Sequence, residues 1–343
     1  MVEKVKLSTI DRFLPVWILG SMAIGLGLGK IFPNLNDSIS TFQIEGTSLP
    51  IALGLFLMMY PVLAKVHYEE LGQLRADKKL LISSLVLNWL IGPALMFVLA
   101  WLFLSDQPEL RTGLIVIGLA RCIAMVLIWN DLACGNREAA ALLVAINSIF
   151  QILAYAILGT FYLRVLPDLL GFDSLEVKFS TADISKAVLI FLGVPLLAGY
   201  VTRKWGIRRK GLNWYNTQFV PKISPFALYG LLFTIILMFA LQGQAIVDSP
   251  NIVAQVALPL LIYFFTMWGF SYAFGKWIGM EYEKATTLAF TAAGNNFELA
   301  IAVSIGVWGI TSGQALVGVI GPLIEVPALV ALVYISLWLR KRY

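Results

Sequence analysis

The stretch Gly118-Leu-Ala-Arg-Cys-Ile-Ala-Met-Val-Leu-Ile-Trp-Asn130 places an arginine and a cysteine, Arg121 and Cys122, in the middle of an apolar segment. A second apolar segment carries Gly294-Asn-Asn-Phe-Glu298 at matching depth. Ionisable groups are costly in lipid, and those that occur inside membrane-spanning segments usually line a transport path. The two stretches therefore predict a membrane protein with a transport function.

The composition is that of an integral membrane protein. Of the 343 residues, 59% are hydrophobic and only 13% are charged, and the mean hydropathy is +0.83. An ordinary soluble domain has about 25% charged residues. No polar segment is long enough for a separate catalytic or ATPase domain, so we expect one transmembrane domain over residues 1–343. The sequence thus predicts neither an enzyme nor a cofactor, and it predicts no obligatory ATPase subunit.

Membrane spans are predicted with a window of about 20 apolar residues, the length that crosses the hydrocarbon core. The window identifies ten candidates, so the predicted fold is all-α and polytopic. The candidates cover about 13–32, 48–66, 80–104, 112–131, 138–163, 186–203, 225–243, 252–275, 286–309 and 314–338. In the first span, Gly25 and Gly29 are four residues apart and predict a face for close helix packing.

The distribution of Lys and Arg predicts the topology. If the N-terminus is cytoplasmic, 19 of the 25 basic residues fall in cytoplasmic segments: Lys4, Lys6, Arg12, Lys65, Arg75, Lys78, Lys79, Arg137, Arg203, Lys204, Arg208, Arg209, Lys210, Lys222, Lys276, Lys284, Arg340, Lys341 and Arg342. The outer segments hold only Lys30, Arg111, Arg164, Lys178 and Lys186. The positive-inside rule therefore favours ten spans with both termini cytoplasmic. This topology explains the net charge of +5, and no nucleic-acid partner is needed to account for it.

The chain shows a faint internal repeat. A shift of 174 positions places Arg121-Cys122 over Asn295-Asn296 and Gln151 over Glu325, without a gap. The predicted repeats are about 13–163 and about 186–338. Because each contains five spans, an odd number, the two repeats must point in opposite directions across the membrane. Inverted repeats whose polar, discontinuous helices meet near the midplane are typical of secondary transporters.

Arg121 and Cys122 each allow two interpretations. Arg121 could serve transport, or it could be a structural cation neutralised by a nearby carboxylate. Cys122 alone would be an inert, small apolar residue, but Arg121 beside it would favour a thiolate, which is a soft ligand for thiophilic elements. Adjacent residues in a helix point about 100° apart, so the two share a pocket most easily if the helix is unwound there. Asn295 and Asn296 predict a similar unwound segment in the ninth span.

Two carboxyl groups lie at the same depth. Glu298 follows the asparagine pair, and Glu325 lies in Gly321-Pro-Leu-Ile-Glu-Val-Pro327, between two prolines. Glu325 could take part in coupling, or it could cap the backbone groups that the prolines leave free. Because the single cation Arg121 faces both carboxyls, we expect one of them to lack a cation and to be able to carry a proton.

Three motifs, Gly118–Asn130, Asn295–Val303 and Gly321–Pro327, resemble the signatures of the arsenite efflux permeases, or arsenical resistance proteins. This family belongs to the bile acid/arsenite/riboflavin transporter superfamily, and the resemblance covers nearly the whole chain. It implies two inverted five-helix repeats, a core domain and a panel domain, and broken, crossing helices 4 and 9. It also implies that Cys122 and Glu298 are needed for arsenite export by proton exchange across the plasma membrane.

The chemistry of the substrate agrees with that implication. Arsenous acid is a mostly neutral, pyramidal trihydroxide, so a carrier needs hydrogen-bonding groups and, for covalent affinity, a thiol that replaces one hydroxyl. We expect Cys122, as the metalloid ligand, to bind As(III) together with Asn295, Asn296 and Glu298. A single thiol keeps binding reversible, as a carrier requires. Antimonite has similar thiophilicity and could follow the same path.

Arg121, Glu298 and Glu325 are the expected coupling and electrostatic groups. The main alternative in the superfamily is a sodium-coupled symporter of organic anions. Arg121 would then hold the substrate carboxylate, and Asn295, Asn296 and Glu298 would be sodium ligands. Sodium dependence of uptake separates the two hypotheses.

Overall fold

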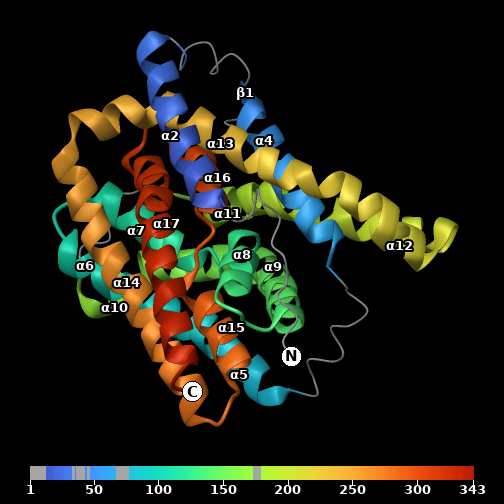
Figure 1. The fold of residues 1–343 in the computed structure, drawn as a ribbon. Coiled ribbons are helices and arrows are strands. Elements are labelled where there is room, and N and C mark those ends of the chain that lie inside the picture. The colour runs from blue at the N-terminus through green and yellow to red at the C-terminus, as the bar shows by residue number, and fades with distance from the viewer. Residues whose placement is uncertain (1–12, 33–34, 36–42, 45–46, 67–76, 173–178) are drawn as a thin grey trace.

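The computed structural model describes residues 13–32, 35, 43–44, 47–66, 77–172 and 179–343, which are almost entirely helical (Figure 1). The elements in chain order are α2 (Leu14–Ile31), β1 (Gln43–Ile44), β2 (Thr47–Ser48), α4 (Leu49–Ala64), α5 (Lys78–Val86), η2 (Leu87–Ile91), α6 (Gly92–Phe103), α7 (Pro108–Leu119), α8 (Met125–Leu132), α9 (Arg137–Thr160), η3 (Phe161–Val165), α10 (Leu166–Leu170), α11 (Thr181–Val188), η4 (Leu189–Gly193), α12 (Val194–Trp214), η5 (Tyr215–Phe219), α13 (Val220–Asp248), α14 (Pro250–Trp277), α15 (Tyr282–Ala293), α16 (Phe297–Trp308) and α17 (Gly313–Arg340). The strands β1 and β2 form one short antiparallel pair.

All ten predicted apolar stretches contain helix, and two of them, 112–131 and 286–309, are each divided into two helices by a break. Within the described residues, six helical segments are long and apolar enough to cross a membrane, namely Leu14–Ile31, Lys78–Phe103, Arg137–Leu170, Thr181–Asp248, Pro250–Trp277 and Gly313–Arg340. The segment Thr181–Asp248 carries two predicted spans, and Gly211, at φ +85°, marks the kink between them. Leu49–Ala64 and Phe297–Trp308 are shorter apolar helices. The structure thus confirms a helical protein with several apolar helices, and ten inverted spans remain a prediction.

Prolines set where the long helices change their winding. Each of the π-helical turns η2, η3, η4 and η5 directly precedes a helix that has a proline at its second position, and these residues are Pro93, Pro167, Pro195 and Pro221. A proline ring collides with the carbonyl one turn before it and cannot donate a hydrogen bond. The wider π turn makes room for the ring, so the helix continues instead of ending.

The helices form two groups that lie side by side in Figure 1. One group contains α2, α4, α12 and α13, and the other contains α5 to α9, α11 and α14 to α17. We call the second group the core; the panel and core domains that the family resemblance implies remain a prediction. In the first group, a Cβ atom added at Gly25 would lie 2.6 Å from the carbonyl oxygen of Ile236, and one at Gly29 would meet the backbone of Ala240. The two glycines therefore let α2 pack closely against α13, as predicted.

The charge pattern that predicts topology can be followed only in part. Lys4, Lys6, Arg12, Arg75 and Lys178 lie outside the described residues. Lys65 follows the C-terminal end of α4, Lys222 lies near the N-terminal end of α13, and Arg137 begins α9. All three belong to the side that the sequence assigns to the cytoplasm.

Candidate functional site

Two broken helices meet in the interior of the core. The break between α7 and α8 covers residues 120–124, and the break between α15 and α16 covers residues 294–296. The two breaks pair as a short antiparallel bridge, in which Cys122 N donates to Gly294 O over 3.2 Å and Asn296 N donates to Ala120 O over 3.0 Å. Two backbone groups that each break frees are thus satisfied by the other break. The breaks predicted in the fourth and ninth spans are present and lie against each other.

The sulfur of Cys122 lies at the start of α8. Val126 N donates to Cys122 Sγ over 3.2 Å, so the sulfur caps the first turn of this half-helix. A Cβ atom added at Gly294 would lie 3.1 Å from Cys122 Cβ, which shows how closely the opposite break approaches. A helix N-terminus stabilises negative charge nearby. Charge that develops on the sulfur is therefore stabilised by α8.

Arg121 does not make the ion pair that the sequence suggested. Its side chain is fully buried. Nη1 donates to the Tyr263 hydroxyl over 2.8 Å and to Ala292 O over 3.3 Å, and Nη2 donates to Gly118 O. Gly118 and Ala292 lie in the last turns of α7 and α15, where the helix dipole concentrates negative charge. Two helix C-termini, and not Glu298 or Glu325, thus neutralise this cation among the described residues.

Two side chains from long helices hold the breaks in place. Gln151 of α9 accepts from Arg121 N over 2.9 Å and donates to Arg121 O over 3.0 Å. Glu325 of α17 accepts from Asn295 N over 3.2 Å through Oε1. Sequence comparison between the halves brought Gln151 and Glu325 into register, but it assigned Gln151 no role. The structure shows that both bind backbone at the crossing.

The two asparagines are partly used by the fold itself. Asn295 Nδ2 donates to Ile117 O over 2.8 Å and to Ala120 O over 3.2 Å, which caps the end of α7. Asn296 Oδ1 accepts from Leu299 N over 3.0 Å and caps the start of α16. Asn295 Oδ1 and Asn296 Nδ2 are buried and make no hydrogen bond. Each asparagine thus retains one polar atom, an acceptor and a donor, that a ligand could use.

Glu298 and the sulfur of Cys122 lie in the same buried region. Glu298 lies in the first turn of α16 and is 7% exposed, and Cys122 is 5% exposed. Glu298 and Glu325 are both close enough to the Cys122 sulfur to act on it electrostatically. The arrangement brings a thiol, two carboxyl groups and two unpaired amide atoms to the helix crossing. Tyr263 is a functional candidate that sequence reasoning missed, because a tyrosine in an apolar span gives no signal of its own.

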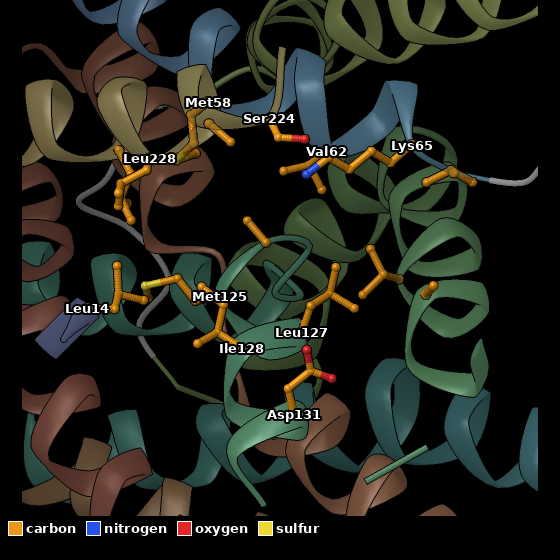
Figure 2. A pocket seen from close by; sticks show the side chains of 16 residues that line it. Leu14, Met58, Val62, Lys65, Met125, Leu127, Ile128, Asp131, Ser224 and Leu228 are labelled. Atoms are coloured by element: carbon orange, nitrogen blue, oxygen red, sulfur yellow. The ribbon is translucent and has the colours of Figure 1, made fainter. Parts of the chain in front are cut away.

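A cavity of about 260 Å³ lies next to this crossing, between the two helix groups. Figure 2 shows its side chains, with Met58, Val62 and Leu228 on one wall and Met125 and Ile128 on the other. Lys65 and Asp131 line the end that the sequence assigns to the cytoplasm. Ala124 and Met125 belong to its lining and come two and three residues after Cys122. Cys122 thus lies just behind the wall of the cavity.

Known proteins resemble this chain over nearly its whole length. A family model described as the sodium bile acid symporter family matches residues 52–249. The chain is 57% identical over 337 residues to "Arsenical-resistance protein Acr3" of Corynebacterium glutamicum, which covers 98% of this chain and 91% of that protein. It is 35% identical over 348 residues to an uncharacterised transporter of Synechocystis, covering 96% of this chain and 88% of that protein. It is 30% identical over 336 residues to "Arsenical-resistance protein Acr3" of Alkaliphilus metalliredigens, covering 95% of this chain and 92% of that protein.

Proposed function

Because the chain belongs to the sodium bile acid symporter family, and within it to the arsenical-resistance proteins, we propose that it is a secondary transporter that exports arsenite from the cell in exchange for protons. The observation that carries this proposal is the position of Cys122. Its sulfur caps a half-helix at the crossing of the two breaks, beside Glu298 and next to a cavity.

The sulfur is the proposed ligand for As(III). The Cys122 thiol attacks arsenous acid, so that an S–As bond forms, one As–OH bond breaks, and the thiol proton leaves with the hydroxyl as water. The reverse reaction with water releases arsenous acid and restores the thiol, so no oxidant or reductant is needed. The developing negative charge on sulfur would be stabilised by the N-terminus of α8. Antimonite would bind in the same way.

The two remaining hydroxyls of the bound metalloid need hydrogen-bonding partners. Asn295 Oδ1 and Asn296 Nδ2 supply an acceptor and a donor that the fold leaves unpaired. Glu298 adds a carboxyl group in the same buried region. Buried polar atoms without partners are costly, so a polar substrate that pairs with them gains binding energy.

The route that we propose begins in the cavity between the two helix groups. As(III) reaches the cavity from the cytoplasmic end at Lys65 and Asp131 and then passes Ala124 and Met125 to the sulfur. Protonation of Glu298 from the outer side weakens its hold on the bound metalloid, and the proton returns inward after release. The first helix group, which contains α2, α4, α12 and α13, would move relative to the core and so expose the site on alternate sides of the membrane.

We also propose that the ten spans form two inverted five-helix repeats, with both termini cytoplasmic and the protein in the plasma membrane. The matched positions of the two breaks support the repeat, because Arg121 pairs with Asn295 in the bridge and the shift of the sequence superposes them. The positive-inside rule supports the orientation.

The sodium-coupled alternative is less favoured. An arginine that holds a substrate carboxylate must direct free donors toward the substrate. Arg121 instead uses its Nη atoms on Tyr263 and on the ends of two helices. Moreover, two of the matched relatives carry arsenical resistance in their names.

The two cysteines provide a test of the ligand. Cys122→Ser removes the sulfur, whereas Cys134→Ser is a matched control at the end of α8, outside the crossing. We expect cells that express Cys122→Ser to lose arsenite tolerance and the Cys134→Ser variant to keep it. Full tolerance with Cys122→Ser, at an equal amount of protein in the membrane, would remove this residue from the mechanism.

Everted membrane vesicles test the coupling. We expect accumulation of As(III) to follow an imposed pH gradient and to be independent of sodium. Accumulation that ignores the pH gradient would exclude proton exchange. Accumulation that requires sodium would favour the alternative.

A further inference from the structure

The two breaks at the crossing are held by the same device. In the first half, the side-chain oxygen of Gln151 accepts from the backbone N–H of Arg121, 30 positions earlier. In the second half, a side-chain oxygen of Glu325 accepts from the backbone N–H of Asn295, also 30 positions earlier. Gln151 and Glu325 differ only in that an amide NH₂ replaces a carboxyl oxygen. The two side chains therefore occupy equivalent places relative to the two breaks.

The second atom of each side chain reveals the difference. Gln151 Nε2 donates to Arg121 O over 3.0 Å, so the amide holds both the N–H and the C=O of one residue. Glu325 Oε2 is buried and makes no hydrogen bond. A carboxylate can only accept, whereas a carboxylic acid can donate through its O–H. With a proton on Oε2, Glu325 has the same pair of groups, one acceptor and one donor, that Gln151 uses on Arg121.

Among the described residues, no nearby cation stabilises a negative charge on Glu325. Its carboxyl group is fully buried, and the described titratable groups that act on it are Glu298 of α16 and the Cys122 thiol. Tyr263 of α14 bonds to Arg121, whose guanidinium is neutralised by the ends of α7 and α15.

The other charged residues on helices packed against α17 all lie in end turns. They are Lys30 of α2, Glu109 and Arg111 of α7, Asp131 of α8, Lys222 and Asp248 of α13, and Lys276 of α14. An ionised Glu325 would therefore be a buried charge beside a second carboxyl group and without a cation to pair with among the described residues. Such an arrangement is strongly unfavourable.

We propose that Glu325 is a positioning residue that acts as a neutral carboxylic acid, the counterpart of Gln151, and fixes the second break while Glu298 carries the exchanged proton. This inference rests on the proposed function for the role of Glu298, but the role of Glu325 depends only on the geometry of the crossing. Because a neutral acid and an amide offer the same pair of bonds, an amide at this position should support the fold and transport.

The test compares Glu325→Ala, Glu325→Gln and Glu298→Gln in the full-length protein. We expect Glu325→Ala to unfold at a lower temperature and to lose As(III) accumulation in everted vesicles by about tenfold or more, because the break is released. Glu325→Gln should restore both properties to within about twofold of the parent and should keep its dependence on the pH gradient. Glu298→Gln should remain folded and lose that dependence.

A spectroscopic measurement addresses the proton directly. The infrared spectrum of the purified protein should contain a C=O stretching band of a buried protonated carboxyl group that disappears in Glu325→Gln. A parent protein without such a band, or a Glu325→Gln protein that fails to fold or loses its pH dependence, would overturn the proposal. If the parent itself ignores a pH gradient, the proposed exchange function fails, while the infrared band and the unfolding temperatures still decide the role of Glu325.

Discussion

Gly92 packs directly against the side chain of Arg121 and the hydroxyl group that holds it. It is the first residue of α6, directly after the π-helical turn η2, and its backbone is helical at φ −58° and ψ −54°. A Cβ atom added there would lie 2.9 Å from Arg121 Nη1, 3.0 Å from the Tyr263 hydroxyl and 3.1 Å from Leu87 O. Favourable contacts of a carbon atom begin near about 3.5 Å, so each neighbour would have to move by about half an ångström. The methyl group thus presses directly on the hydrogen bond between Arg121 and Tyr263.

Whether Gly92→Ala stabilises or destabilises the protein distinguishes two expectations. Helix propensity alone favours Ala over Gly by about 1 kcal/mol. Overpacking a closely fitted interior costs about 1–3 kcal/mol, and the guanidinium has little freedom because several of its donors are already engaged. We therefore expect a net destabilisation of up to about 2 kcal/mol and reduced arsenite export. A matched control is Gly27→Ala in α2, where an added Cβ meets nothing within 4 Å.

Thermal unfolding of the purified proteins in one detergent measures the stability difference, and As(III) accumulation in everted vesicles measures transport. Gly92→Ala should unfold a few degrees below the parent, whereas Gly27→Ala should unfold at or above it. Tyr263→Phe in the Gly92→Ala background should have a smaller effect than in the parent, because the hydroxyl has already been displaced. If Gly92→Ala unfolds no earlier than Gly27→Ala and transports normally, the position assigned to Arg121 is wrong.

Two further predictions follow from other contacts. In Arg121→Lys, a single ammonium group cannot reach both helix ends and the tyrosine hydroxyl, so we expect a loss of about 2 kcal/mol or more of stability and a loss of transport. Arg164→Lys, at an exposed position, is the control and should have no effect. Equal unfolding temperatures for the two variants would contradict this expectation. Asp77 caps α5 and lies 2.5 Å from Lys284, and this hydrogen bond lowers the pKa of Asp77 below its ordinary value. The stability that the pair contributes is therefore present at neutral pH and is lost as the pH falls through that lowered pKa. Between about pH 5 and about pH 3, the unfolding temperature of the parent should therefore fall more than that of Asp77→Asn. Parallel curves for the two proteins would show that the pair contributes nothing.

The breaks in the fourth and ninth spans could be predicted because polar residues interrupt apolar sequence at matched positions. Arg121 and Asn295 have no place in a continuous lipid-facing helix, and the structure pairs these two residues in the bridge. All ten apolar stretches also contain helix, with breaks in two of them, since their length and composition leave few other structures in lipid. Prolines such as Pro93 and Pro195 predicted interruptions, but only the structure shows that a π turn absorbs each of them.

The partners of the polar groups could not be predicted. Charge balance suggested that Arg121 would face a carboxyl group, yet helix-end carbonyls and a tyrosine hydroxyl accept the hydrogen bonds of its two Nη atoms. Backbone carbonyls are present at every position, so the sequence cannot show which of them converge. The same difficulty applies to Asn295, because an amide that caps a helix and an amide that binds substrate are identical in sequence. The assignment of substrate-binding and coupling roles stays a prediction for each of these residues.

The cavity in Figure 2 also has a mechanical consequence. Its facing walls are built mainly from methionine and aliphatic side chains, with Met58 and Leu228 opposite Met125 and Ile128. Contacts between such surfaces have no preferred direction, and the flexible thioether chains can re-pack in several arrangements. Walls of this kind can shift past each other more easily than walls joined by hydrogen bonds of fixed geometry. The crossing of the two broken helices, which lies behind the cavity wall, can then remain rigid while the two helix groups move relative to each other.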